Sequence, residues 1–316
     1  MKKILFTFFL TAVLVSCAIL CTAGYLAGDY LVGFALERGS FGDPQGPPHA
    51  YALLMPPDKR QFNPPDAPSE EWHLRSTDGL FLNATHFWPD EESSRWVMIL
   101  HGYGCTQQNS WFIAGTYLQM GYHVLTPDLR ASGKSEGSYV TMGYRESQDI
   151  VDWAWRITEL HPDAQIVMHG VSMGAASVMI AAASRGLPPT MKAAIEDCGY
   201  SSAYTILAHQ LEAAFGLPAF PIMAFVDFAC KKRAGFSLRE ASPLDAVKEA
   251  RVPMLFIHGD ADTLVPPTMC WELYENCSAS RKDYFSVPNA GHAVACQKYP
   301  DLYYQKISGF LRPLMQ

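Results

Sequence analysis

From Glu70 onward the chain alternates short apolar runs with longer amphipathic stretches, and this alternation restricts the fold more than any other feature. The runs are five residues long and bounded by Gly, Pro or Asp, as expected of strands that are buried on both faces. They occupy residues 96–100, 123–127, 165–169, 193–197, 254–258 and 283–287. Buried helix segments could have the same composition, but the short lengths and the flanking breakers favour strands.

Helix-like stretches separate these runs, at residues 110–120, 143–160, 174–185, 201–232, 268–277 and 300–313. A hairpin precedes them, because "WHLRS" and "LFLNATHFW" flank the turn Thr77-Asp78-Gly79. The hairpin and six strand–helix units predict an α/β fold with a mostly parallel, eight-stranded sheet and helices on both faces. In such sheets, ligands bind at the carboxyl ends of the strands.

An uncharged apolar run from Ile4 to Gly28 follows Lys2 and Lys3. At about 1.5 Å per residue it would reach about 37 Å as a helix, longer than the roughly 30 Å hydrocarbon core of a bilayer. Residues 1–28 are therefore predicted to be an N-terminal transmembrane helix or uncleaved signal. The leading lysines predict an N-terminus in the cytoplasm and the rest of the chain outside. Two alternatives are a lipoprotein modified at Cys17, from the lipobox-like "LVSC", and a secreted protein cleaved near "CTAG".

Eight of the 22 prolines fall between Gly42 and Pro68. A segment with so much proline is stiff and extended, so residues 29–69 are predicted to be a stalk or linker. The folded domain would then span residues 70–316.

Charge and cysteine spacing exclude several classes of function. The net charge is −7 and no basic stripe is present, so a nucleic-acid partner is not expected. The eight cysteines form no C-x-x-C or Cys/His pattern, which predicts no metal site. Cys270 and Cys277 would lie about 10 Å apart on a helix, too far for a disulfide.

The stretch "HGVSMGAAS" places Ser172 between an apolar strand and an Ala-rich helix. Gly170 and Gly174 flank it in the pattern of a nucleophile elbow, whose sharp turn leaves no room for neighbouring side chains. A helix-capping serine would explain Ser172 but not both glycines. Ser172 is therefore the predicted nucleophile.

Chain order selects the partners of Ser172, because the acid and then the histidine follow the serine in this class of enzyme. His209 falls in a helical stretch and His258 ends a strand, whereas His292 lies in the loop "PNAGHAV" after the last strand. His292 is the predicted base. Asp262, in "HGDADTLVP", is the favoured acid.

Two other carboxylates follow predicted strands. Asp197 is a rival acid, and Asp260 is expected to form a turn. The oxyanion of the tetrahedral intermediate needs two main-chain N–H donors. Met173 directly follows the nucleophile, and Tyr103 lies in the glycine-rich loop "HGYG" after residues 96–100.

The ordered motifs "HGYG", "DLRASGKSEG", "GVSMG", "HGDADTLVP" and "NAGHA" resemble those of the serine α/β-hydrolase superfamily over residues 70–314. The resemblance is closest to membrane-anchored bacterial members that are esterase-like or serine-aminopeptidase-like. It implies a Ser172–Asp262–His292 triad, an oxyanion hole at Tyr103 and Met173, and no cofactor. The motif "DLRASG" departs from the family pattern, because many relatives have glycine at the position of Ala131.

The expected function is hydrolysis of carboxylic esters with short to medium acyl chains through an acyl-enzyme. Hydrolysis of amides or peptides, or acyl transfer, would use the same triad, and a non-catalytic surface-binding protein is a third hypothesis. Apolar residues in 200–236 could form a helical lid over an acyl pocket or pack a helix onto the sheet. These residues are Leu211, Phe215, Leu217, Phe220, Ile222, Phe225 and Phe228.

Overall fold

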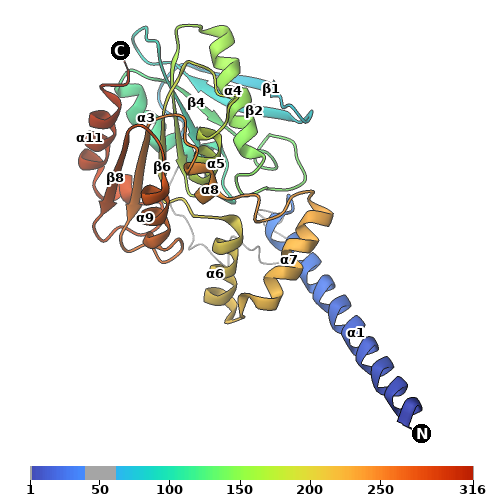
Figure 1. Cartoon of the computed structure of the whole chain (residues 1–316). Coiled ribbons are helices and arrows are strands. Elements are labelled where there is room, and N and C mark those ends of the chain that lie inside the picture. The colour runs from blue at the N-terminus through green and yellow to red at the C-terminus, as the bar shows by residue number, and fades with distance from the viewer. Residues whose placement is uncertain (1, 40–61, 316) are drawn as a thin grey trace.

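The predicted strands form one eight-stranded sheet in the computed structural model, which describes residues 2–39 and 62–315 (Figure 1). The strands are β1 (Ser69–Arg75), β2 (Phe81–Phe87), β3 (Arg95–Leu100), β4 (His123–Pro127), β5 (Gln165–Val171), β6 (Met191–Asp197), β7 (Met254–Gly259) and β8 (Lys282–Val287). Their order across the sheet is β1-β2-β4-β3-β5-β6-β7-β8. β2 pairs antiparallel with β1 and β4, and the remaining neighbours are parallel. The predicted hairpin and mostly parallel sheet are confirmed.

Both faces of the sheet are buried. Because side chains alternate between the two faces along each strand, successive residues enter different apolar clusters. In β3, Met98 and Leu100 enter one apolar cluster, while Val97 and Ile99 enter the other. Helices α4 (Glu146–Leu160), α5 (Met173–Ala182), α8 (Pro243–Val247) and α9 (Pro267–Asn276) contribute to the first cluster. Helices α3 (Trp111–Gln119) and α11 (Pro300–Leu311) contribute to the second.

The stretch expected to be one helix at 201–232 is two helices, α6 (Ala203–Phe215) and α7 (Ala219–Arg233). Gly216 ends α6 with a left-handed φ of 63°, the usual geometry of a helix C-terminus, and Pro218 follows it. Sequence analysis also missed α8 and the short helix α10 (Ala295–Lys298), which have too few residues to show a helical period.

The N-terminal helix α1 (Lys2–Leu36) continues past the boundary expected at Gly28, so residues 29–36 are not a stalk. Its last turns are held by the rest of the protein, since Val32 and Leu36 are buried and join the first apolar cluster. The N-terminal part projects away from the sheet (Figure 1). Residues 40–61 of the proline-rich segment lie outside the described residues.

Candidate active site

Ser172 sits in the sharp turn between β5 and α5, with φ of 57° and ψ of −115°. L-residues rarely adopt such a conformation, which costs roughly 1–3 kcal/mol. A Cβ atom at Gly170 would lie 2.1 Å from the carbonyl oxygen of Gly174, and one at Gly174 would lie 2.1 Å from that of Leu100. Both glycines are therefore required by the close approach of strand and helix.

The hydroxyl of Ser172 is hydrogen-bonded to His292, and His292 is hydrogen-bonded to Asp262. Ser172 Oγ lies 2.9 Å from His292 Nε2, and His292 Nδ1 lies 2.7 Å from Asp262 Oδ2. Because the carboxylate can only accept, Nδ1 carries the hydrogen and Nε2 is left to accept the serine proton. The three residues follow β5, β7 and β8, and so meet at the carboxyl edge of the sheet.

The rival carboxylates have other partners. Asp197, at the end of β6, accepts a hydrogen bond of 2.7 Å from the hydroxyl of Tyr303. Asp260 accepts one from the main-chain N–H of Asn289, in keeping with a turn-forming role. The structure therefore brings Asp262, and neither Asp197 nor Asp260, into hydrogen-bond contact with His292.

A second histidine, His258, also contacts Asp262. Its Nε2 lies 2.9 Å from the carbonyl oxygen of Val265 and 3.2 Å from Asp262 Oδ2. We did not expect His258 in the site because it ends a strand. Its position four residues before Asp262 was nevertheless a usable signal that the two side chains lie close together. Asp262 thus accepts hydrogen bonds from two imidazoles and from the main-chain N–H groups of Leu264 and Val265.

These contacts decide the charge of Asp262. Burial disfavours its ionised form, but the hydrogen bonds from His258 and His292 outweigh burial and hold the pKa of Asp262 below its usual range. Burial also opposes a charge on His258, yet the hydrogen bond to Asp262 and the nearby Glu196 raise the pKa of His258. Asp262 is therefore an anion at neutral pH and can stabilise a positive charge on His292.

Behind His258, Glu196 is fully buried at the end of β6. Its Oε1 accepts a hydrogen bond from the thiol of Cys270 and its Oε2 accepts one from the N–H of Gly199, both at 2.9 Å. Burial raises the pKa of Glu196 to about 7, against the smaller opposing effects of His258 and these hydrogen bonds. Glu196 consequently titrates near neutral pH.

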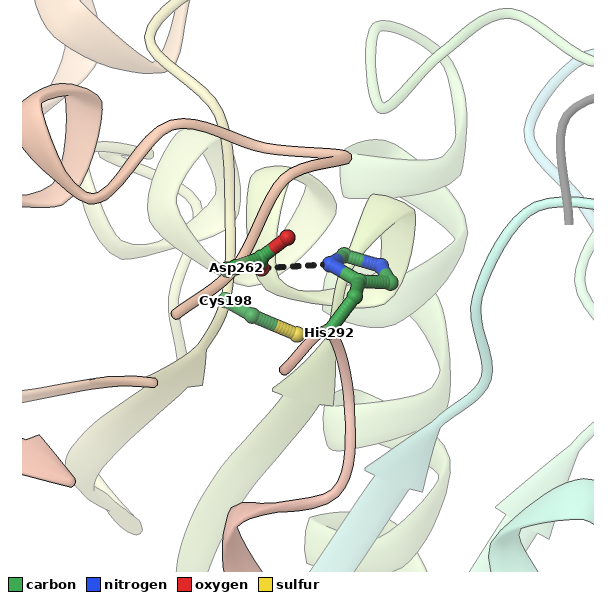
Figure 2. Close-up of side chains that lie close together, drawn as sticks. All are labelled: Cys198, Asp262 and His292. Carbon is green, nitrogen blue, oxygen red and sulfur yellow. Dashed lines mark hydrogen bonds and ion pairs between the residues drawn. The ribbon is translucent and has the colours of Figure 1, made fainter. Parts of the chain in front are cut away.

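Cys198 lies beside Asp262 and His292, and the ligand atoms of the three side chains are within 4.8 Å of one another (Figure 2). Burial, followed by the nearby carboxylates Asp197 and Asp262, raises the pKa of the Cys198 thiol. The thiol of Cys198 is therefore neutral in this environment.

Two main-chain N–H groups lie near Ser172. Met173 is the first residue of α5, so its N–H has no partner within the helix. Gly102 lies against Ser172, since a Cβ atom there would be 3.4 Å from Ser172 Cβ. The next peptide N–H in that loop belongs to Tyr103.

His101 holds this loop in place. Its Nε2 accepts a hydrogen bond of 3.0 Å from the N–H of Leu129, so Nδ1 carries the hydrogen and donates to the carbonyl of Gly102 at 2.9 Å. Because C=O and N–H point in opposite directions in a trans peptide, the N–H of Tyr103 is directed away from His101.

A cavity of about 390 Å³ opens beside Ser172 and His292. Its volume is within the usual range for small-molecule sites. The wall is mainly apolar and comes from α1, α6 and α7. It is formed by Leu31, Phe34, Ala35, Ile206, Leu207, Leu211, Phe215, Met223 and Val226.

The apolar residues of the expected lid take different positions. Leu211 and Phe215 line the cavity, as one of the two alternatives predicted. Phe225 packs instead against Gly24 and Gly28 of α1, a partner that neither alternative had considered. Helices α6 and α7 therefore border the cavity, and α7 also packs against the N-terminal helix.

Ala131, where the sequence departs from the family pattern, has a left-handed backbone conformation. Ala131 adopts a φ of 58°, and its N–H donates a hydrogen bond of 2.9 Å to the carbonyl of Glu136. Glycine reaches this left-handed conformation without strain, which agrees with the glycine that the family resemblance leads one to expect at this position. The turn is kept here with alanine.

Comparison with known proteins agrees with this architecture. A family model described as the alpha/beta hydrolase fold matches residues 95–221. The uncharacterized protein YqkD of Bacillus subtilis is 28% identical over 239 residues, which cover 75% of this chain and 77% of YqkD. An uncharacterized membrane protein of Saccharomyces cerevisiae is 26% identical over 177 residues, 56% of each chain.

Among solved structures, an esterase of Pyrococcus furiosus superposes with a TM-score of 0.65 at 22% identity, covering 79% of this chain and 92% of the esterase. That similarity covers more of the chain than residues 95–221. With the strand order, the turn at Ser172 and the match to the family model, it leads to one assignment: the chain has the α/β-hydrolase fold.

Proposed function

We propose that the protein is a serine hydrolase that cleaves carboxylic esters. The observation that carries the proposal is the continuous hydrogen-bonded path from Ser172 through His292 to Asp262, at the mouth of an apolar cavity. This arrangement supplies a nucleophile, a general base and a group that orients the base. The similarity to a solved esterase supports the choice of esters.

The reaction would proceed in two halves. His292 Nε2 takes the proton of the Ser172 hydroxyl as Oγ attacks the carbonyl carbon, and the N–H groups of Tyr103 and Met173 stabilise the oxyanion. The C–O bond to the alcohol then breaks, and His292 gives its proton to the leaving oxygen. In the second half His292 takes a proton from water, whose oxygen attacks the acyl-enzyme. Release of the carboxylic acid returns the proton to Ser172.

The experiment that tests this proposal uses the full-length protein in detergent. We expect a fluorophosphonate probe to form an adduct on the peptide that contains Ser172, and the protein to hydrolyse p-nitrophenyl butyrate. Ser172→Ala should lose both properties, while the control Ser308→Ala, on α11, should keep them. Hydrolysis that persists in Ser172→Ala would reject the nucleophile assignment.

The same preparation separates the alternatives. A folded wild-type protein that neither labels nor hydrolyses any ester would favour the non-catalytic binding protein. A higher kcat/KM for aminoacyl p-nitroanilides than for esters would favour amide hydrolysis. Acyl transfer would appear as ester product when an alcohol acceptor is added.

We also propose that α1 anchors the protein in a membrane with the catalytic domain on the outer side. α1 is long and apolar enough to cross a bilayer, with mean hydropathy of 2.6 over its most apolar window, and that window is exposed. The yeast relative, described as a membrane protein, is consistent with an anchor. Protease digestion of intact cells should remove the catalytic domain, and protection of that domain would contradict the orientation.

A further inference from the structure

The N-terminal helix forms part of the wall of the cavity. Leu31, Phe34 and Ala35 of α1 line the same space as Ser172 and His292. The carbonyl of Ala35 also accepts a hydrogen bond from the hydroxyl of Tyr103, whose main-chain N–H is the proposed oxyanion donor. An anchor that only tethered the enzyme would not need to reach the reaction centre.

Helix α1 is too long to lie wholly within a bilayer. A hydrocarbon core of about 30 Å takes up roughly 20 residues, so a span that starts near Lys3 ends near Thr22. The following turns, to Leu36, then lie beyond the hydrocarbon and are the ones that pack on the catalytic domain. The cavity residues of α1 belong to this outer part.

Helix α7 is packed closely along this outer part of α1. A Cβ atom at Gly28 would lie 2.6 Å from the carbonyl oxygen of Phe225, so only glycine permits the approach. Further along, Arg233 pairs with Asp29 and Glu37. These interactions fix α7 to α1 at both ends of the region in which the two helices touch.

The two helices run in the same direction, because the contacts advance together from Gly28 with Phe225 to Gly33 with Arg233. The start of α7 and the turn from α6 must then lie further toward the membrane-spanning part of α1. Figure 1 shows the α6–α7 turn on the same side of the molecule as the N-terminal part of α1. This turn would meet the bilayer surface.

The turn and the neighbouring outer surface of α1 and α7 expose large apolar side chains, which we call the collar. The collar consists of Leu26, Tyr30, Phe215, Leu217, Phe220 and Phe228. Phe220, at the start of α7, is 80% exposed, and leaving so large an apolar side chain in water is unfavourable. Phe215 belongs both to the collar and to the cavity wall, so the cavity reaches the collar.

We propose that the collar sits in the bilayer interface and that the cavity takes its substrate from the membrane. The substrate class is an amphiphilic acyl ester that resides in the bilayer, whose acyl chain enters past Phe215 and lies against Leu31 and Phe34 of the anchor helix. This rests on the ester hydrolysis proposed above. It replaces the expected short to medium acyl chain with one long enough to partition into a membrane.

The chemistry of the cavity supports this class. Its wall is mainly apolar and includes Phe215 and Leu31, together with Ser172 and His292. An acyl chain would leave the hydrocarbon for surroundings of similar polarity, at little cost in solvation. The ester group would then reach the nucleophile while the polar head stays near the interface.

A readout that needs no catalysis tests the bilayer contact. In full-length Ser172→Ala protein reconstituted into phosphatidylcholine vesicles, Phe220→Trp should add fluorescence that brominated phosphatidylcholine quenches. Leu302→Trp, on α11 and away from the collar, should add fluorescence that is not quenched beyond the parent protein. Equal quenching of the two added tryptophans, or none at position 220, would overturn the proposal even if the enzyme hydrolyses esters.

A second experiment tests membrane delivery of substrate. Leu217 is 42% exposed in the collar and Leu302 is 46% exposed on α11, so the two leucines form a matched pair. Leu217→Asp should lower hydrolysis of monooleoylglycerol in vesicles about tenfold, because a carboxylate is costly near the hydrocarbon. Leu302→Asp should not lower it. Rates on soluble p-nitrophenyl acetate, measured for both, show whether the chemistry is intact.

A third experiment tests the anchor helix as a cavity wall. Leu31→Trp should fill the cavity and lower the ratio of kcat/KM for p-nitrophenyl laurate over p-nitrophenyl acetate about tenfold. Leu20→Trp, on the same helix but exposed and outside the collar, should leave this ratio unchanged. An unchanged ratio in Leu31→Trp would overturn the role of α1. Absence of any ester hydrolysis by wild type would instead reject the proposed function and leave the quenching result to stand.

Discussion

The hydroxyl of Tyr103 donates a hydrogen bond to the main-chain carbonyl of Ala35, which joins the loop after β3 to the last turn of α1. The carbonyls at a helix C-terminus have no partner within the helix and need one elsewhere. Tyr103 satisfies one of them with its side chain, while its main-chain N–H is the proposed oxyanion donor. Helix α1 and the candidate active site are therefore linked through Tyr103.

Replacing Tyr103 with phenylalanine should separate its two roles. Tyr103→Phe keeps the main-chain N–H but leaves the Ala35 carbonyl without this donor, at a cost of about 1–2 kcal/mol. We expect the midpoint of thermal unfolding to fall by about 3 °C, with kcat for p-nitrophenyl butyrate reduced less than fivefold. Tyr30→Phe, exposed on α1, is the matched control. A loss of kcat of a hundredfold or more would show that the hydroxyl itself acts on the substrate.

The two buried carboxylates near His292 can be told apart by the same substitution at each. Asp262→Asn should lower kcat by about 10⁴-fold, because an amide stabilises neither the correct tautomer nor the positive charge of the imidazole. Asp197→Asn keeps an acceptor for the Tyr303 hydroxyl and should lower kcat less than tenfold. Steady-state kinetics on p-nitrophenyl butyrate provide the measurement, and the reverse order of effects would assign the acid to Asp197.

The strained backbone at Ser172 predicts that this serine lowers the free energy of unfolding of the protein. Ser172→Gly should relieve the unfavourable φ and ψ, whereas Ser172→Ala removes the hydroxyl and keeps the strain. Both variants should be inactive, but the free energy of unfolding should be about 1–2 kcal/mol higher for Ser172→Gly, after allowing for the greater entropy of unfolded glycine. Chemical denaturation of the two variants in the same detergent measures the difference. A lower value for Ser172→Gly would contradict the strain.

The strands and the elbow could be predicted because their causes are local. A strand buried on both faces must be uniformly apolar, and an elbow in which strand and helix nearly touch must have Gly170 and Gly174. Each of these requirements can be recognised in the sequence from a few neighbouring residues. The break between α6 and α7 was also marked, by Gly216 and Pro218, but the apolar residues on either side concealed it.

The docking of α1 could not be predicted, because its causes are distant in the chain. Gly24 and Gly28 in an apolar run are typical of a membrane helix and say nothing about Phe225 as their partner. Arg233 pairs with Asp29, 204 positions earlier, and a charge in isolation does not indicate its partner. The second imidazole on Asp262 was missed for a related reason, since His258 reads as the end of a buried strand.

Glu196 should make the stability of the protein depend on pH. Burial raises its pKa in the folded state to about 7, above the ordinary value of 4.5, so the folded protein holds a proton that the unfolded chain has lost. The stabilising contribution is complete below about pH 4.5 and is lost as the pH rises to about 7, by about 3 kcal/mol over the window. In Glu196→Gln no such proton exists. The free energy of unfolding of wild type relative to Glu196→Gln should therefore fall between pH 5 and pH 8.

The difference between the two proteins is the quantity to measure, because Asp149 also has a pKa raised to about 7 and titrates equally in both. Denaturant unfolding at half-unit pH intervals, with activity as a check on folding, gives the two curves. The difference between the two curves should be constant below about pH 4.5 and should shift against wild type as the pH rises to about 7. Parallel curves across the whole range would mean that Glu196 is ionised throughout, with His258 as its compensating charge.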